Sequence, residues 1–338
     1  MSAKSLGAHA LFLVVALVFA WVQAHGVEEK KGGPTSTTLL DAKKGEVKKL
    51  DYQWPKGTSS VEPKGKDEAR TAVMTLSREI DAPKAKDAGP DAGPANTTPA
   101  TTHEDAKFPA GKSVMTSVEA FEPLKTRRTL GDVDAERLKA MGLDKPERSL
   151  TVTTTSGQTV ALEIGEASYG GQGRYARVKG QSAVHLLDSA VVTGLEGGAD
   201  TLMEKRIITA NLEEIVGYAA RFGDKTGEYV QRDREQSAKR KFVAKGSQGG
   251  DGDVEGEAPG KLMTTLRNLR AVKVADPKLA ASAVATLSVD VVGRDKQKIE
   301  VLERTDGAGH LVSTGGWLFE LSETQSKELL EDLGALFE

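Results

Sequence analysis

The chain of 338 residues contains no cysteine. Disulfide bonds, thiolate metal sites and cysteine nucleophiles are therefore excluded. Aromatic residues make up only 5% of the sequence, so the core must be built mainly from Val, Leu, Ile and Ala and is expected to be small. The length is sufficient for two ordinary domains.

A large excess of one charge is also absent. Lys and Arg together number 46 and Asp and Glu 49, which gives a formal net charge of −3. Proteins that hold nucleic acid by electrostatics usually carry a broad basic surface. The short clusters Arg127–Arg128 and Lys239–Lys241 are instead typical of a solvated surface, so we expect no nucleic-acid partner.

The patterns that mark common catalytic sites are lacking as well. The five histidines show no metal-ligand spacing, and there is no G-x-S-x-G turn. Acidic residues are numerous, but none forms a pair on an apolar background of the kind that general acid–base catalysis uses. The sequence therefore predicts no catalytic residue, no metal and no cofactor, and we expect a protein that is not an enzyme.

One long apolar run lies near the N-terminus. Leu6 to Ala24 contains no Asp, Glu, Lys or Arg, and about 19 helical residues at ~1.5 Å each approach the ~30 Å thickness of a bilayer core. This run predicts a membrane helix, with a single pass through the inner membrane and the bulk of the chain in the periplasm. The small residues Val22 and Ala24 fit the alternative, a cleaved signal peptide that leaves a secreted or periplasmic protein.

Composition divides the rest of the chain. Residues 81–112 are rich in Ala, Pro, Gly, Asp and Thr, and residues 246–260 in Gly and acidic residues, which predicts a disordered insert and a flexible one. The predicted divisions are 1–25, a membrane anchor or signal segment; 26–45, a spacer; 46–135, a first strand/helix unit containing the insert 81–112; 136–205, a first meander-plus-helix unit; 206–275, a second strand/helix unit containing the insert 246–260; and 276–338, a second meander-plus-helix unit.

The order of predicted elements is the same in the two halves. Alternating apolar residues predict hairpins at 149–165 and 286–304, and a glycine-rich turn, a strand and a helical stretch follow each of them. This agreement predicts an internal repeat. The predicted fold class is α+β: an N-terminal membrane helix followed by repeated antiparallel strand and hairpin units that each carry short helices on one face.

Several motifs match a functional pattern only in part. Gly171, Gly173 and Ala176 spell G-x-G-x-x-A, but a dinucleotide site needs a helix from the second glycine onward, and the residues that follow favour a strand. We therefore predict a hairpin turn and no nucleotide. The stretch 110–117 matches only the end of a phosphate-binding loop, and 251–257 only the start of a calcium loop.

Three residues are candidate contacts to a ligand or partner. Tyr175 and Arg177 lie two positions apart in a predicted strand and so share one face. Trp317 lies in the second half, at the start of its last predicted strand. Aromatic and guanidinium groups on one face suit contact with a carbohydrate or a peptide. These residues motivate the alternative function, an extracytoplasmic module that binds a glycan or cell-wall fragment.

The stretch 124–233 resembles a bacterial family catalogued as domain of unknown function 4340. The resemblance rests on Gly142-Leu143-Asp144-Lys145-Pro146, on Leu162-Glu163-Ile164-Gly165 and on Tyr175-Ala176-Arg177. It implies an N-terminal membrane helix, an extracytoplasmic repeat region and an accessory or scaffold role, in some members beside ABC-type transporter components of the gliding-motility kind. No catalytic residue is established for this family.

Taken with the resemblance, the residues favour one function. We expect a membrane-anchored, extracytoplasmic, non-enzymatic accessory or scaffold protein of the bacterial envelope that binds a protein partner, such as an ABC-type transporter component. Glycan binding is the second hypothesis, and an enzyme with a pocket assembled from distant residues is the third.

Overall fold

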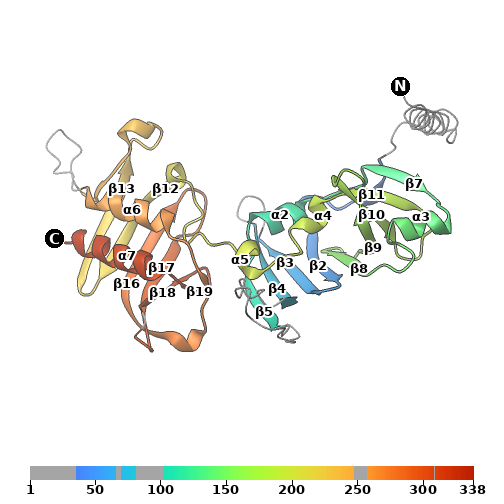
Figure 1. Cartoon of the computed structure of the whole chain (residues 1–338). Helices are drawn as coiled ribbons and strands as arrows, with labels where there is room; N and C mark the ends of the chain where they lie inside the picture. The colour runs from blue at the N-terminus through green and yellow to red at the C-terminus, as the bar shows by residue number, and fades with distance from the viewer. Residues whose placement is uncertain (1–35, 66–69, 81–101, 247–256, 308) are drawn as a thin grey trace, which may run out of the picture.

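The computed structural model describes residues 36–65, 70–80, 102–246, 257–307 and 309–338. These residues form two lobes, each built on one large sheet, and the segment 203–211 connects them (Figure 1). The strand pairs within both sheets are antiparallel.

The first lobe contains the elements up to the connecting segment. Its elements are β1 (Thr38–Leu40), β2 (Val47–Trp54), β3 (Gly57–Lys64), β4 (Thr71–Ile80), β5 (Thr102–Pro109), α2 (Lys112–Glu119), β6 (Leu124–Lys125), β7 (Arg128–Gly131), α3 (Ala135–Ala140), β8 (Arg148–Thr154), β9 (Thr159–Ala167), β10 (Gly173–Val178), β11 (Val184–Asp188), α4 (Ala190–Thr193) and α5 (Ala199–Leu202).

The second lobe begins after the connecting segment. Its elements are β12 (Ile215–Phe222), β13 (Lys225–Arg232), β14 (Lys241–Ala244), α6 (Ala258–Asn268), β15 (Lys273–Val274), β16 (Ala280–Val291), β17 (Gln297–Arg304), β18 (His310–Thr314), β19 (Trp317–Glu320) and α7 (Glu323–Ala335), with single 3-10 turns at Leu212–Glu214, Ser237–Lys239 and Pro277–Leu279.

The two large sheets have the same strand order. The first runs β5-β4-β3-β2-β8-β9-β10-β11-β7, and the second runs β14-β13-β12-β16-β17-β18-β19-β15. From β4 to β7, each strand of the first sheet thus has a counterpart in the second, and β5 is an additional edge strand. Each lobe is therefore one copy of the same antiparallel arrangement.

A pair of helices covers one face of each sheet, α2 with α4 and α6 with α7 (Figure 1). A buried hydroxyl joins the helices of each pair. Ser117 Oγ in α2 donates to the Ala190 carbonyl of α4 (2.7 Å), and Thr265 Oγ1 in α6 donates to Asp332 Oδ2 of α7 (2.6 Å). The Asp332 carboxylate also pairs with Lys261 Nζ (2.8 Å), which ties α7 to α6 a second time.

The core of each lobe lies between its sheet and its helices. Alternate residues of the hairpin strands point inward, so Leu150, Val152 and Leu162 of the first sheet and Leu287 and Ile299 of the second are buried. Val114 and Leu266 on the helices complete these cores.

The observed class corrects the predicted one. Strands hold 47% of the described residues and helices 21%, so the fold is mostly β rather than α+β. The difference arises because the helices are short and because two polar stretches form strands. Polar and charged residues predominate in β3, together with a glycine and a proline, and they also predominate in β5. Neither strand therefore shows the apolar alternation that reveals strands in a sequence.

The strand β5 also corrects the predicted insert. It lies inside 81–112, of which residues 81–101 are outside the described part of the chain. Phe108 of β5 is buried in the core, and Glu104 forms an ion pair with Arg78 of β4 (2.5 Å). Pairing with β4 therefore orders a segment whose composition is typical of disorder.

The predicted membrane helix is not supported. In the part of the chain that the structure covers, no helix is long and apolar enough to cross a membrane. The helix α7 has 13 residues, whereas a span needs about 20, and the covering helices are amphipathic because one face packs on a sheet. The run Leu6 to Ala24 lies outside the described residues. With no such helix among the described residues, the membrane helix in the predicted fold class and the single-pass inner-membrane localisation are withdrawn and are not carried further.

Candidate functional site

The glycine-rich loop 168–172 joins β9 to β10. The Ser168 N–H donates to the Gly173 carbonyl, and the Gly171 N–H donates to the Ser168 carbonyl (both 2.8 Å), so the loop is closed by its own backbone. At its tip, Tyr169 is fully exposed, with a relative exposure of 104%. A large aromatic side chain therefore stands in solvent on a closed loop.

The backbone requires glycine at two positions of this loop and at the first residue of β10. Gly170 and Gly171 have φ of 85° and 70°, a left-handed conformation that favours glycine. Gly173 has ordinary φ, but a Cβ there would lie 2.7 Å from the Leu187 carbonyl oxygen. Arg127 braces the loop from outside, because its guanidinium donates to the Gln172 carbonyl.

A hollow of ≈ 250 Å³ lies beside the loop, at the end of the sheet next to α4. We call it the loop hollow. Its lining consists of Ala167, Gly171, Gly173, Arg174, Ser189, Val192, Thr193 and Glu196. Apart from Arg174 and Glu196, the lining residues are small and uncharged, so these two charged side chains decide what the loop hollow accepts.

Only one of the two carboxylate oxygens of Glu196 accepts hydrogen bonds in the described structure. Its Oε1 accepts from the Tyr52 hydroxyl and from Arg148 Nε (3.3 Å), and in the described structure no donor reaches its Oε2. Burial, followed by the hydrogen bond to Glu196, raises the pKa of Tyr52 well above its usual value. Tyr52 therefore stays a neutral donor that orients Glu196.

Arg174 lines the same space but does not pair with Glu196. Its Nη1 donates to the Gly165 carbonyl (3.3 Å), and no ion pair joins it to a carboxylate in the part of the chain that the structure covers. The loop hollow thus offers unused guanidinium donors and an unused carboxylate acceptor. A guest group that is itself both acceptor and donor, such as a carboxamide or a peptide unit, satisfies both.

The predicted contact residues do not form one site. Tyr175 and Arg177 share a face of β10, but Arg177 is occupied: its Nη2 lies 2.6 Å from a Glu163 oxygen, and the same atom donates to the Leu143 carbonyl (3.3 Å). Tyr175 is half-buried on the face opposite Arg174. Trp317 lies in β19 of the other lobe, partly buried against the core.

The partial motifs have ordinary structural roles. The residues after Gly173 form the strand β10, and Ala176 is buried in the core, which fits the predicted hairpin turn. In the stretch 110–117, which matches the end of a phosphate-binding loop, Gly111 precedes α2 and its N–H donates to the Leu202 carbonyl (2.7 Å). This N–H is therefore not available to bind a phosphate. Most of the stretch 251–257 lies outside the described residues.

Five residues of the site were missed by sequence reasoning: Tyr52, Arg148, Tyr169, Arg174 and Glu196. Tyr52 and Glu196 are 144 residues apart, and they meet only because β2 pairs with β8 and because α4 covers that end of the sheet. The one local signal was Tyr169, an aromatic residue followed directly by two glycines at the tip of a predicted hairpin.

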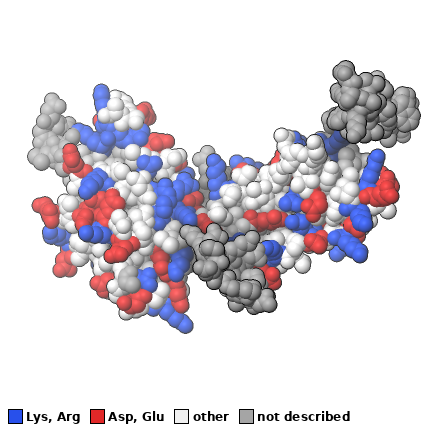
Figure 2. Space-filling model, in the orientation of Figure 1, with Lys and Arg blue, Asp and Glu red and all other residues white. Residues whose placement is uncertain are grey.

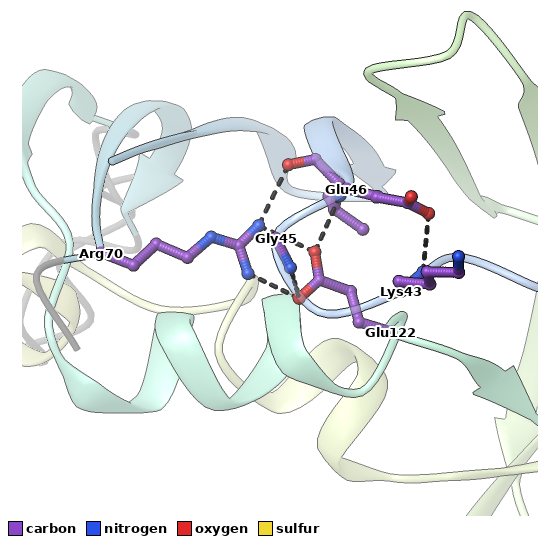
Figure 3. A network of polar contacts seen from close by, with 6 residues as sticks. Lys43, Gly45, Glu46, Arg70 and Glu122 are labelled. Atoms are coloured by element: carbon purple, nitrogen blue, oxygen red, sulfur yellow. Dashed lines mark hydrogen bonds and ion pairs between the residues drawn. The ribbon is translucent and has the colours of Figure 1, made fainter. Parts of the chain in front are cut away.

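A second polar cluster in the first lobe is fully buried (Figure 3). The guanidinium of Arg70 and the carboxylate of Glu122 are 5% and 1% exposed. Glu122 also accepts the N–H groups of Gly45 (3.0 Å) and Val47 (2.7 Å). Both carboxylate oxygens are thus occupied by the protein, so the cluster fastens the turn before β2 to the segment after α2 and leaves no atom for a ligand.

Another hollow, a shallow one of ≈ 530 Å³, lies on the open face of the second sheet. Lys298 and Glu300 on its rim pair with each other (2.7 Å), and Glu228 pairs with Lys245 (2.5 Å). Among the described residues, no group of three or more His, Asp or Glu side chains could hold a metal ion.

Comparison with known proteins identifies the family. The model of the domain of unknown function DUF4340 matches residues 101–290, from β5 of the first lobe to β16 of the second, and this match includes the stretch 124–233 that carries the predicted resemblance. No curated protein and no solved structure matches the chain. Because the family match covers more than half of its length, the chain belongs to the DUF4340 family.

Proposed function

We propose that this protein is a non-enzymatic accessory or scaffold protein that binds another protein through Tyr169 and the loop hollow. The observation that carries the proposal is the fully exposed Tyr169 on a braced loop, beside a hollow whose Arg174 and Glu196 do not pair.

The chemistry of the loop hollow favours a polypeptide. Tyrosine is enriched among the residues that contribute most to protein interfaces, and a loop that is already closed loses little entropy on binding. The unused donors of Arg174 and the unused Glu196 oxygen suit a carboxamide side chain or a peptide group. A hollow of ≈ 250 Å³ has room for one such group.

The family resemblance adds an expectation about the partner, namely a component of an ABC-type transporter of the gliding-motility kind. The alternative function, binding of a glycan or cell-wall fragment, draws support from the same exposed tyrosine, because aromatic rings also stack on sugars. The two functions predict different results in one experiment.

The experiment is affinity purification from the producing organism with the wild-type chain and with Tyr169→Ala, with quantification of the proteins recovered. We expect a protein in stoichiometric amount with the wild-type chain and a loss of at least about tenfold with Tyr169→Ala, as for a residue central to an interface. Val292→Ala is the matched control, because Val292 is also exposed but lies in the other lobe.

Sedimentation with cell-wall material and a glycan array provide the second arm. The alternative function would be supported instead if the chain is retained on glycans in a way that depends on Tyr169 and if affinity purification recovers no protein in stoichiometric amount. Recovery of the same proteins with Tyr169→Ala as with the wild-type chain would overturn the role of the loop.

A further inference from the structure

We infer that a basic cluster beside the connecting segment binds an acidic segment of a protein partner. This inference rests on residues of the connecting segment and of the second lobe, and it is independent of the loop hollow. The cluster consists of Lys205, Arg206, Arg267, Arg270 and Lys273 and is called the junction cluster below.

Backbone pairing brings these residues together. The Ala271 N–H donates to the Lys205 carbonyl (2.7 Å), and Arg206 and Arg270 form an isolated antiparallel bridge. Arg270 Nη1 donates to the Arg267 carbonyl at the end of α6 (2.7 Å). The basic residues of the connecting segment and those of the α6–β15 turn therefore lie on adjacent, paired stretches of backbone.

The carboxylates nearby neutralise only part of this charge. Glu204 holds Arg206 through two contacts, to Nε (3.0 Å) and Nη2 (2.9 Å). Glu320 is shared between Lys273 and Arg304 (3.4 Å each). Within the described residues, no carboxylate forms an ion pair with Lys205, Arg267 or Arg270, so a net positive surface remains.

The position of the cluster suits a partner. On the face drawn in Figure 2, Lys and Arg side chains gather on the side of the second lobe next to the first lobe. Val272, between Arg270 and Lys273 in the sequence, has 51% of its surface exposed. An apolar side chain inside a basic surface fits a segment that combines acidic residues with an apolar one.

A purely structural role explains only part of the cluster. Cations in the last turn of α6 stabilise its C-terminal carbonyl groups, which accounts for Arg267 and Arg270. It does not account for Lys205, which lies on the connecting segment. Nucleic acid is a poorer occupant, because the junction cluster contains no aromatic residue on which bases could stack and the whole chain has a net charge of −3.

The test measures binding of a short, fluorescently labelled polyglutamate peptide to the whole chain by anisotropy. We expect binding at low ionic strength that weakens as salt is added. The variant Lys205→Glu/Arg267→Glu should lose at least about tenfold in affinity. Lys327→Glu/Arg232→Glu is the matched control, because it changes the net charge equally at two exposed positions outside the cluster.

A neutral variant, Lys205→Gln/Arg267→Gln, tests whether the charge-reversed variant merely fails to fold. It should keep the wild-type thermal unfolding midpoint and lose an intermediate amount of affinity for polyglutamate. Equal losses in the cluster and control variants would overturn the inference, as would no binding by the wild-type chain. Tighter binding of a single-stranded oligonucleotide than of polyglutamate would also overturn it. Tyr169→Ala must leave polyglutamate binding unchanged, which separates this result from that of the proposed function.

Discussion

At the scale of single residues, the charged groups of the first lobe differ in how far the protein itself satisfies them. Glu122 accepts from Arg70 and from two backbone N–H groups, so its role is structural. Glu196 uses one oxygen for Tyr52 and Arg148, its other oxygen accepts from no donor in the described structure, and the residue lines the same hollow as Arg174. We base the functional proposal on this difference rather than on burial or charge alone.

The buried pair Arg70–Glu122 yields a stability prediction. Glu122→Gln leaves the Arg70 guanidinium buried at 5% exposure without a counter-charge, and we expect a loss of about 3–5 kcal/mol in the free energy of unfolding. Urea denaturation measures this loss. Glu136→Gln, an exposed change in α3, should shift stability by less than about 0.5 kcal/mol, and an equally small effect at Glu122 would contradict the prediction.

His185 yields a prediction about pH. It is 4% exposed, its Nδ1 contacts Thr129 Oγ1 (3.1 Å), and its Nε2 has no partner in the described structure. Burial lowers the pKa of His185, so the folded state binds its proton less readily than the unfolded state does. The free energy of unfolding therefore has its full value above the unfolded pKa of about 6.5. It decreases as the pH falls from there through the lowered pKa of His185 in the folded state.

We therefore expect the free energy of unfolding to fall between pH 7.5 and 5, as measured by urea titration at each pH. His185→Gln should remove the part of this acid loss that His185 causes, whereas His310→Gln should retain it because His185 is still present. An identical acid loss in wild type and His185→Gln would refute the assignment.

At the scale of elements, the helix pairs show that the same junction can be made with different chemistry. Ser117 bonds a backbone carbonyl of α4, whereas Thr265 bonds the side chain of Asp332 in α7. The longer helix α7 supplies a carboxylate where the short helix α4 offers only its backbone. The second lobe therefore depends on a side-chain pair at a place where the first does not.

This difference predicts energetic coupling between Thr265 and Asp332. Thr265→Val leaves Asp332 Oδ2 without its donor and should cost about 1–3 kcal/mol. In a double-mutant cycle with Asp332→Asn, we expect a coupling energy of about 0.5–3 kcal/mol by urea denaturation. Additive effects of the two changes would show that the contact contributes nothing of its own.

Sequence reasoning was accurate for some elements and failed for others, for physical reasons. The hairpins β8–β9 and β16–β17 follow from apolar alternation, since one face of each strand is buried. The strand β5 was missed because its pairing with β4 and its buried Phe108, rather than its composition, order it. The loop hollow was missed because its residues come together only through strand pairing.

At the scale of the whole molecule, two copies of one antiparallel arrangement carry different surfaces. The first lobe has the exposed Tyr169 and the loop hollow, and the second has the junction cluster next to the connecting segment. The match to the DUF4340 family, residues 101–290, includes part of each lobe. Together, the two proposals would have this protein hold a partner at more than one point.

The most direct measurement of the central claim is site-specific photo-crosslinking in the producing organism, with a photoreactive phenylalanine derivative in place of Tyr169. Val292, exposed in the second lobe, is the control position. Our account predicts one major protein adduct at position 169, absent at position 292, which weakens when Arg174→Ala or Glu196→Gln is added. No protein adduct at position 169, or one of equal yield in the presence of both added changes, would contradict it.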